Sequence, residues 1–158
     1  MGIRLFPTSM HRTTRTSLLV ALSFAWHAMP ANAVDLDQPL SGYLQIGSRA
    51  VAGPAADYIE VRLIIPPDLR VYAGSKITLQ IPQFPNAVVR YPEPSRFRMV
   101  DGSVHDVYAG AISVTAAIPR GAARCGRPIA SVLTVQGCTA SICFPPEAIP
   151  LPATVSSC

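Results

Sequence analysis

Apolar and polar residues alternate along several short segments of the chain. The segment 58–65, YIEVRLII, is the clearest, because every second residue from Ile59 to Ile65 is aliphatic and the residues between them are mostly polar. A period of two places such aliphatic side chains on one face of a β-strand. Further strands are predicted at 69–72, 76–81, 86–92, 107–118 and 130–137, with shorter ones at 42–47, around Cys143 and at 151–155.

Turn-forming residues separate these segments and indicate the fold class. Residues 66–68, Pro-Pro-Asp, predict a turn, and 73–75, Ala-Gly-Ser, predict a hairpin between the two strands that flank them. Prolines and β-branched residues interrupt every candidate helix. About seven to nine short strands with turns roughly every 8–12 residues are typical of an all-β protein. We predict an immunoglobulin-like antiparallel β-sandwich, with a small barrel as the alternative.

The N-terminal segment has the three parts of a secretory signal peptide. Residues 1–16 carry three arginines and no acid, 17–29 are apolar but too few for a comfortable membrane span, and 31–33 form an Ala-x-Ala cleavage pattern. We therefore expect 1–33 to be removed. The mature chain, 34–158, would be one domain in the periplasm with no membrane span.

Charge gives little reason to expect a nucleic-acid partner. The full chain has a formal net charge of +4, and the predicted cleavage would remove three arginines and no acid. The remaining basic residues are spread along the sequence, whereas nucleic-acid binding needs them clustered. We therefore expect no nucleic acid among the partners.

All four cysteines lie in the predicted mature chain. Export would place them in an oxidising compartment, where disulfides persist. Cys125 lies in a loop rich in arginine and glycine, and Cys158 is the last residue. We expect a Cys125–Cys158 disulfide that ties down the C-terminal tail. The alternatives are free thiols at both positions and an interchain bridge through Cys158.

Cys138 and Cys143, separated by four residues, allow three interpretations. A structural disulfide closing so short a loop would contribute only about 2 kcal/mol. A closed zinc site needs four ligands, and the mature chain has a single histidine, His105. Cu(I) needs only two or three thiolates. The alternative function is therefore a non-enzymatic secreted β-sandwich binding module that chaperones a partner or holds Cu(I) through these cysteines.

The third interpretation is thiol–disulfide exchange, which needs an accessible thiolate and a second thiol close to it. Gly137 permits a tight turn into the loop, and Pro145 and Pro146 stiffen the chain after it. No charged residue lies between the cysteines, so we expect their reactivity to be induced when a partner docks. The spacing favours this interpretation.

Four other polar or aromatic residues could contribute to a site. His105-Asp106 has the composition of a catalytic dyad, but no nucleophile motif accompanies it, and a turn between strands is the favoured interpretation. Tyr72 and Tyr108 are candidates to flank the cysteines, although lone tyrosines in strands usually serve packing.

The sequence LTVQGCTASICFPPE, residues 133–147, resembles the active-site segment of the N-terminal periplasmic domain of the thiol:disulfide interchange protein DsbD and its relatives. The likeness rests on Gln136-Gly137-Cys138 and on Cys143-Phe144-Pro145-Pro146-Glu147. Upstream, YPEPSRF at 91–97 is similar to that family's Trp-Pro-x-Pro-x-Arg-Phe segment. The strands at 69–81 and 107–119 resemble those around it, so the likeness spans roughly 55–155.

The resemblance implies an immunoglobulin-like domain that takes electrons from a thioredoxin-like donor and passes them to oxidised clients, with no cofactor beyond its cysteines. It implies that Cys143 forms the mixed disulfide with partners and that Cys138 resolves it. Members of the family cover their cysteines with an aromatic-bearing cap loop. The segment 99–108 is the candidate here, although it has no aromatic residue before Tyr108.

Full-length members of that family continue into a membrane domain and a C-terminal thioredoxin domain, whereas this sequence stops at Cys158. We expect a free-standing module or the product of a split gene. Its partners would then be thioredoxin-like redox proteins and a membrane electron carrier that are encoded separately.

Overall fold

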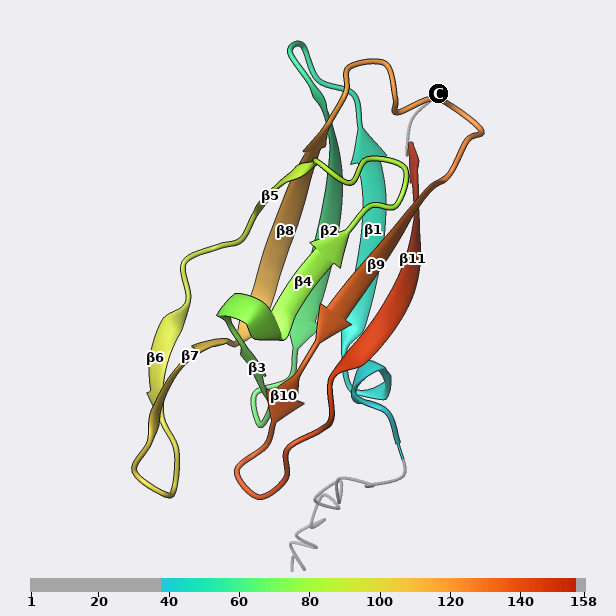
Figure 1. The fold of residues 1–158 in the computed structure, drawn as a ribbon. Coiled ribbons are helices and arrows are strands. Elements are labelled where there is room, and N and C mark those ends of the chain that lie inside the picture. The colour runs from blue at the N-terminus through green and yellow to red at the C-terminus, as the bar shows by residue number, and fades with distance from the viewer. Residues whose placement is uncertain (1–37, 156–158) are drawn as a thin grey trace, which may run out of the picture. The chain divides into compact units, whose positions relative to one another are not determined.

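The computed structural model describes residues 38–155, which form two β-sheets and two short 3-10 helices (Figure 1). The predicted signal peptide, 1–33, and Cys158 lie outside the described residues. The helices are η1 (Leu40–Gly42) and η2 (Gly74–Lys76). The all-β class predicted from the alternating pattern is confirmed.

The larger sheet has seven strands in the order β4-β9-β11-β1-β2-β8-β5. In Figure 1, β4 and β9 cross in front of β1 and β2, so that the sheet folds over to make the two layers of a sandwich. Its strands are β1 (Gln45–Val51), β2 (Asp57–Ile65), β4 (Ile77–Gln80), β5 (Val88–Arg90), β8 (Gly110–Ile118), β9 (Ile129–Val135) and β11 (Glu147–Val155).

The smaller sheet has four short strands in the order β10-β3-β7-β6 and lies at one end of the sandwich. All of its pairs are antiparallel. Its members are β3 (Arg70–Tyr72), β6 (Ser95–Arg98), β7 (Val104–Tyr108) and β10 (Gly137–Cys138). Because β10 continues the chain from β9, this sheet places the cysteine loop at the end of the domain.

Strand β11 connects the two layers, since it pairs with β9 on one side and with β1 on the other. Its pairing with β1 is parallel and is confined to the last residues, Thr154 and Val155. Pro150 and Pro152 precede them and have no N–H to donate to a neighbouring strand. The Ser48 hydroxyl donates to the Pro152 carbonyl at 2.9 Å, so a side chain takes the place of a backbone pair there.

The hydrophobic core lies between the layers. In β2, every second residue from Asp57 to Ile65 is buried, and the three central aliphatic side chains are fully enclosed. Each fully buried aliphatic side chain stabilises the fold by roughly 1.5–3 kcal/mol relative to an exposed one. The completely inaccessible members of the core are Ile59, Val61, Leu63, Val71, Val114, Ala116, Leu133, Val135 and Ala153.

The predicted hairpin across residues 73–75 is wrong. β3 and β4 do not pair, because β3 joins the smaller sheet between β10 and β7, whereas β4 pairs with β9. The intervening η2 begins at Gly74, whose φ of 68° lies in the left-handed region that glycine tolerates best. This turn directs the chain from one sheet to the other.

Two predicted single strands are each divided between the sheets. The segment 107–118 breaks before Gly110, whose φ is 66°, into β7 and β8. The segment 130–137 breaks at Gln136 into β9 and β10. The strand expected around Cys143 is only a one-residue bridge to Cys138, and β6 was not predicted.

Candidate functional site

Cys138 and Cys143 are joined by a disulfide with an S–S distance of 2.07 Å. They face each other across a tight hairpin, with their Cα atoms 4.0 Å apart. The Thr139 N–H donates to the Ile142 carbonyl at 2.8 Å, and the Phe144 N–H donates to the Gly137 carbonyl at 2.9 Å. Backbone hydrogen bonds on both sides of the cysteine pair therefore fix the hairpin.

The two sulfur-bearing residues differ sharply in exposure. Cys138 is 1% exposed, whereas Cys143 belongs to the exposed residues. Cys138 is the last residue of β10, which is paired with β3, and Cys143 lies on the returning arm of the hairpin. An approaching protein can therefore reach Cys143 without opening the fold.

Gly137 allows β10 to lie close to its neighbours. A Cβ atom at this position would meet the Arg70 carbonyl oxygen at 2.8 Å and the Leu40 side chain at 3.5 Å. The first distance is too short for a carbon–oxygen contact, and the oxygen belongs to the backbone of β3. A glycine before Cys138 is thus required by packing, in addition to the turn suggested by the sequence.

Glu147 fastens η1 to the segment that follows the cysteines. Its carboxylate accepts hydrogen bonds from the Ser41 hydroxyl at 2.5 Å and from the Ser41 N–H at 2.8 Å. Just after η1, the Tyr43 ring packs on the Phe144 ring with centroids 5.4 Å apart. These contacts hold η1 beneath β10, where Leu40 is 1% exposed.

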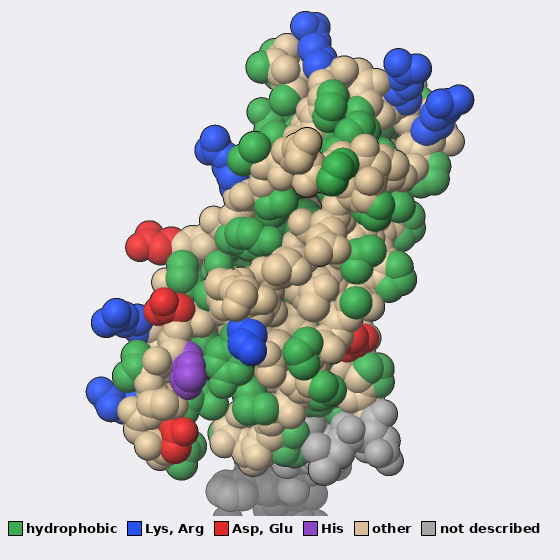
Figure 2. Space-filling view, in the orientation of Figure 1, with side chains coloured by type: hydrophobic (Ala, Val, Ile, Leu, Met, Phe, Trp, Pro, Cys, Tyr) green, Lys and Arg blue, Asp and Glu red, His purple; other side chains and the backbone are tan. Residues whose placement is uncertain are grey.

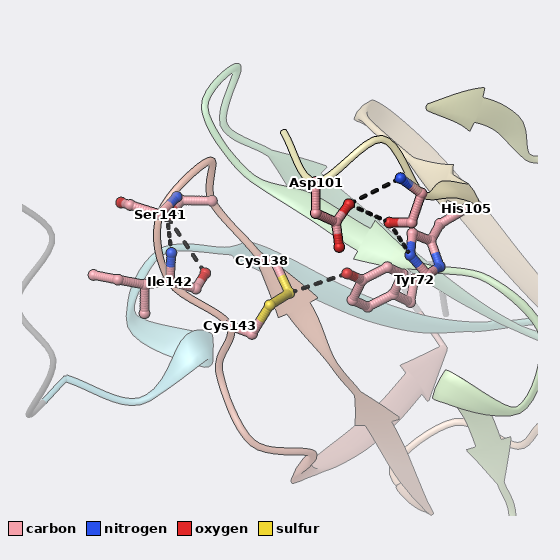
Figure 3. The surroundings of a disulfide bond; sticks show 9 residues. Tyr72, Asp101, His105, Cys138, Ser141, Ile142 and Cys143 are labelled. Carbon is pink, nitrogen blue, oxygen red and sulfur yellow. Dashed lines mark hydrogen bonds between the residues drawn. A yellow bond between two sulfur atoms is a disulfide. The ribbon is translucent and has the colours of Figure 1, made fainter. Parts of the chain in front are cut away.

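Tyr72, in β3, reaches the disulfide directly (Figure 3). Its hydroxyl lies 3.3 Å from the Cys138 sulfur, and because a disulfide sulfur carries no hydrogen, the hydroxyl is the donor. The Tyr72 ring also makes an edge contact with the His105 imidazole, with centroids 5.2 Å apart and planes 70° apart. Tyr72 is therefore confirmed as a neighbour of the cysteines.

A polar chain extends from His105 away from the disulfide. The Ser103 hydroxyl donates to Asp101 at 2.6 Å, and the same oxygen lies 3.0 Å from His105 Nε2 (Figure 3). Because the only hydroxyl hydrogen is used on Asp101, Nε2 is the donor to Ser103. The hydroxyl and the N–H of Ser103, with a smaller contribution from the charge of His105, lower the pKa of Asp101.

An open groove of about 890 Å³ begins beside Cys143. Tyr72, His105, Tyr108 and Gln136 are among the residues that line it. The Tyr108 hydroxyl donates to the Pro92 carbonyl at 3.1 Å, and burial raises the pKa of this tyrosine. The two tyrosine hydroxyls thus have different roles, because that of Tyr72 contacts the Cys138 sulfur and that of Tyr108 fixes the groove wall to the backbone at Pro92.

The predicted cap segment, 99–108, forms the turn and second strand of the β6–β7 hairpin. Residues 104–106 line the groove, but Cys143 remains exposed beside them. His105 and Asp106 lie within β7, so the predicted turn at these residues is wrong. Asp106 is 3.9 Å from the Arg96 side chain, and His105 is bonded to Ser103, so they do not form a dyad.

Charge is unevenly distributed over the visible face of the domain. Figure 2 shows charged side chains along the edge that carries β5, β6 and β7, and others at the end opposite the cysteine loop, with few over β4 and β9. In residues 38–155, no cluster of three or more His, Cys, Asp or Glu side chains lies close enough to share a metal ion. The same residues include no helix that is long and apolar enough to cross a membrane.

Cys125 lies away from the groove, in the exposed loop between β8 and β9. It is disulfide-bonded, and its predicted partner, Cys158, lies outside the described residues. The pairing of these two cysteines therefore stays a prediction. Cys138 and Cys143 are brought together as the sequence suggested, whereas the contributions of Tyr72, Ser41 and Leu40 come from contacts distant in sequence.

Comparison with known proteins supports the fold. No protein-family profile and no curated protein matches the chain. The DsbD N-terminal domain of Neisseria meningitidis in its reduced form is similar in structure, with a TM-score of 0.53 and 18% sequence identity over 74% of this chain and 89% of that one. The same domain in complex with the N-terminal domain of PilB gives a TM-score of 0.52 and 18% identity over 73% of this chain and 85% of that one.

A further similar structure is the N-terminal periplasmic domain of ScsB from Proteus mirabilis, with a TM-score of 0.49 and 17% identity over 80% of this chain and 49% of that one. The two DsbD structures show that this chain has the fold of the DsbD N-terminal domain over the 73–74% of its length that they match. The fold implied by the sequence resemblance is confirmed, and the predicted immunoglobulin-like sandwich with it.

Proposed function

We propose that this chain is a periplasmic thiol–disulfide exchange domain that takes electrons from a thioredoxin-like donor and passes them to oxidised client proteins. The observation that carries the proposal is the asymmetric disulfide. Cys143 is exposed and lines a groove, and its partner Cys138 is buried and held on β10. Exchange needs one sulfur that a foreign thiolate can reach and a second that stays beside it.

The exposures support distinct roles for the two cysteines. A donor thiolate attacks the exposed Cys143 sulfur, the bond to Cys138 breaks, and Cys138 leaves as a thiolate. The second thiolate of the donor then attacks the donor's own sulfur in the mixed disulfide, and Cys143 leaves as a thiolate. Two electrons have then passed to this domain, and the thiolates take up protons from water.

The oxidative half of the cycle uses the same geometry. The Cys143 thiolate attacks a client disulfide, and one client sulfur leaves as a thiolate. Cys138 then attacks Cys143, which re-forms the original disulfide and releases the second client sulfur. Cys143 is thus the exchanging residue and Cys138 the resolving residue.

The nature of the partners is supported by the likeness to a domain solved in complex with PilB. We propose that a thioredoxin-like domain likewise binds this chain at the exposed Cys143, and that a membrane electron carrier supplies electrons to such partners. The predicted signal peptide and the oxidised cysteines favour the periplasm as the compartment.

The test begins with the mature chain, 34–158. We expect its Cys138–Cys143 bond to have a reduction potential between roughly −120 and −270 mV, the range of exchange-active proteins. Cys143→Ser should abolish mixed disulfides with a thioredoxin-like domain, and Cys138→Ser should trap them. A Cys125→Ser, Cys158→Ser double variant is the control and should exchange like the wild type.

Two results would contradict the proposal. A potential below about −300 mV would mark the disulfide as structural. Tight Cu(I) binding by the reduced protein without any exchange would instead favour the binding module considered from the sequence. If both single-cysteine variants behaved alike, the assignment of roles would be wrong even if exchange occurred.

A further inference from the structure

Tyr72 occupies a position that thiol–disulfide exchange at this site would use chemically. We propose that Tyr72 is a catalytic residue whose hydroxyl stabilises the Cys138 thiolate when the disulfide is attacked at Cys143. This inference rests on the proposed function and adds a third residue to the reacting pair. Tyr72 contacts one of the reacting atoms, since its hydroxyl is 3.3 Å from the Cys138 sulfur.

Burial creates the need for such a group. Cys138 is 1% exposed, so a thiolate formed there has little access to solvent. A buried charge without a hydrogen-bond partner is strongly disfavoured, and the cost falls on the leaving group of the exchange reaction. Among the hydrogen bonds within residues 38–155, the contact from Tyr72 is the one that reaches this sulfur.

The backbone holds Tyr72 in place from both sides. Its N–H donates to the Gln136 carbonyl at 2.9 Å, and the N–H of the following residue, Ala73, donates to the Asp106 carbonyl at 2.9 Å. The ring rests against His105 on β7. Because β3 lies between β10 and β7, the hydroxyl is positioned before any partner arrives, and preorganised donors stabilise a developing charge most effectively.

The chemical step can be written with all atoms accounted for. The attacking thiolate forms a bond to the Cys143 sulfur while the bond between Cys143 and Cys138 breaks, and the electron pair of that bond goes to Cys138. The Tyr72 hydroxyl keeps its proton and strengthens its hydrogen bond as the negative charge develops. The Cys138 thiolate is then protonated by water or attacks Cys143 again, which restores the starting disulfide.

The test replaces the hydroxyl and leaves the ring. Tyr72→Phe retains the contact with His105, so its fold should be preserved, and circular dichroism checks this. Reduction by a small dithiol such as dithiothreitol should be about tenfold slower than in the wild type, equivalent to about 1.4 kcal/mol. The matched control is Tyr58→Phe. Tyr58 is 39% exposed on β2, so the loss of its hydroxyl should not alter the rate of reduction by dithiothreitol.

A second readout separates catalysis from a structural role. In the reduced protein, Tyr72→Phe should shift the thiolate absorbance titration of the cysteine pair to higher pH, because the thiolate loses its donor. A merely structural hydroxyl would not move this titration. Equal reduction rates and equal titrations for Tyr72→Phe and the wild type would overturn the proposal.

The small dithiol makes the outcome independent of the natural partner. If a thioredoxin-like domain failed to exchange with the wild type, the proposed function would fail, yet the dithiol rates would still decide the role of Tyr72. If the wild type exchanged and Tyr72→Phe matched it with both reductants, only the role of Tyr72 would be wrong.

Discussion

Replacing Gly137 by alanine tests how the close packing of β10 governs the cysteine loop. The added Cβ would lie 2.8 Å from the Arg70 carbonyl oxygen and 3.5 Å from Leu40. The Leu40 contact is ordinary, but the oxygen belongs to the backbone of β3 and can move only if the paired strands separate. Overpacking of this kind typically costs about 1–3 kcal/mol.

For a domain of this size, the same cost lowers the melting temperature by roughly 4–12 °C. Thermal unfolding of the oxidised mature chain, followed by circular dichroism, measures it. Because β10 carries Cys138, a displaced strand should also move the sulfur away from the Tyr72 hydroxyl. We therefore expect Gly137→Ala to slow reduction by dithiothreitol as well as to destabilise the protein.

Gly47→Ala is the matched control. Gly47 is also a strand glycine, in β1, but a Cβ there would meet no atom within 4 Å. An alanine in a strand restricts the unfolded chain more than a glycine does, so this variant should be as stable as the wild type or slightly more so. If Gly137→Ala melted at the temperature of Gly47→Ala, the packing argument for β10 would be refuted.

Three further substitutions test the contacts around the site and the core. Glu147→Gln removes the charge that accepts two hydrogen bonds from Ser41, and urea unfolding should show a loss of about 1–2 kcal/mol; a loss equal to that of an exposed Glu93→Gln control would argue against the clamp. Leu40→Ala should cost about 2–5 kcal/mol by leaving a cavity beneath β10, and an unchanged midpoint would show that η1 does not support the strand. The Ala123 N–H, with smaller contributions from other backbone N–H groups, lowers the pKa of buried Asp57 below its usual 3.8. The ionised carboxylate therefore stabilises the fold above pH 3.8. This contribution is lost as the pH falls through the lower pKa that Asp57 has in the folded protein. Acid unfolding of Asp57→Asn should accordingly be less steep below pH 3.8 than that of the wild type, and parallel curves would contradict the linkage.

The local alternation of apolar and polar residues was sufficient to predict the strands that bury one face. β2 alternates so regularly that its sequence predicted the strand almost to the residue, and the burial follows the same period. The hairpin across 73–75 could not be predicted correctly, because the pairing of β3 with β10 joins residues far apart in the chain. Local turn chemistry at Gly74 is compatible with either path, and only the competition between the two sheets decides it.

At the candidate site, too, local sequence predicted some features, whereas contacts between distant parts of the chain determine the others. Cys138 and Cys143 could be identified from their spacing and from the residues that follow them. The difference in their exposure could not, because it depends on the pairing of β10 with β3 and on Leu40 lying close to Gly137. The sequence suggested Tyr72 as a neighbour of the cysteines, but its contact with the Cys138 sulfur follows from the register that pairs Val71 with Gly137.

The hairpin that carries the cysteines is closed by hydrogen bonds that do not involve sulfur, from Thr139 to Ile142 and from Phe144 to Gly137. Opening the disulfide therefore leaves the two thiols confronting each other at a high effective concentration. A mixed disulfide formed at Cys143 would be short-lived, because the Cys138 thiol that resolves it is already beside it. Each encounter with a partner would therefore end quickly, either in electron transfer or in release of the partner unchanged.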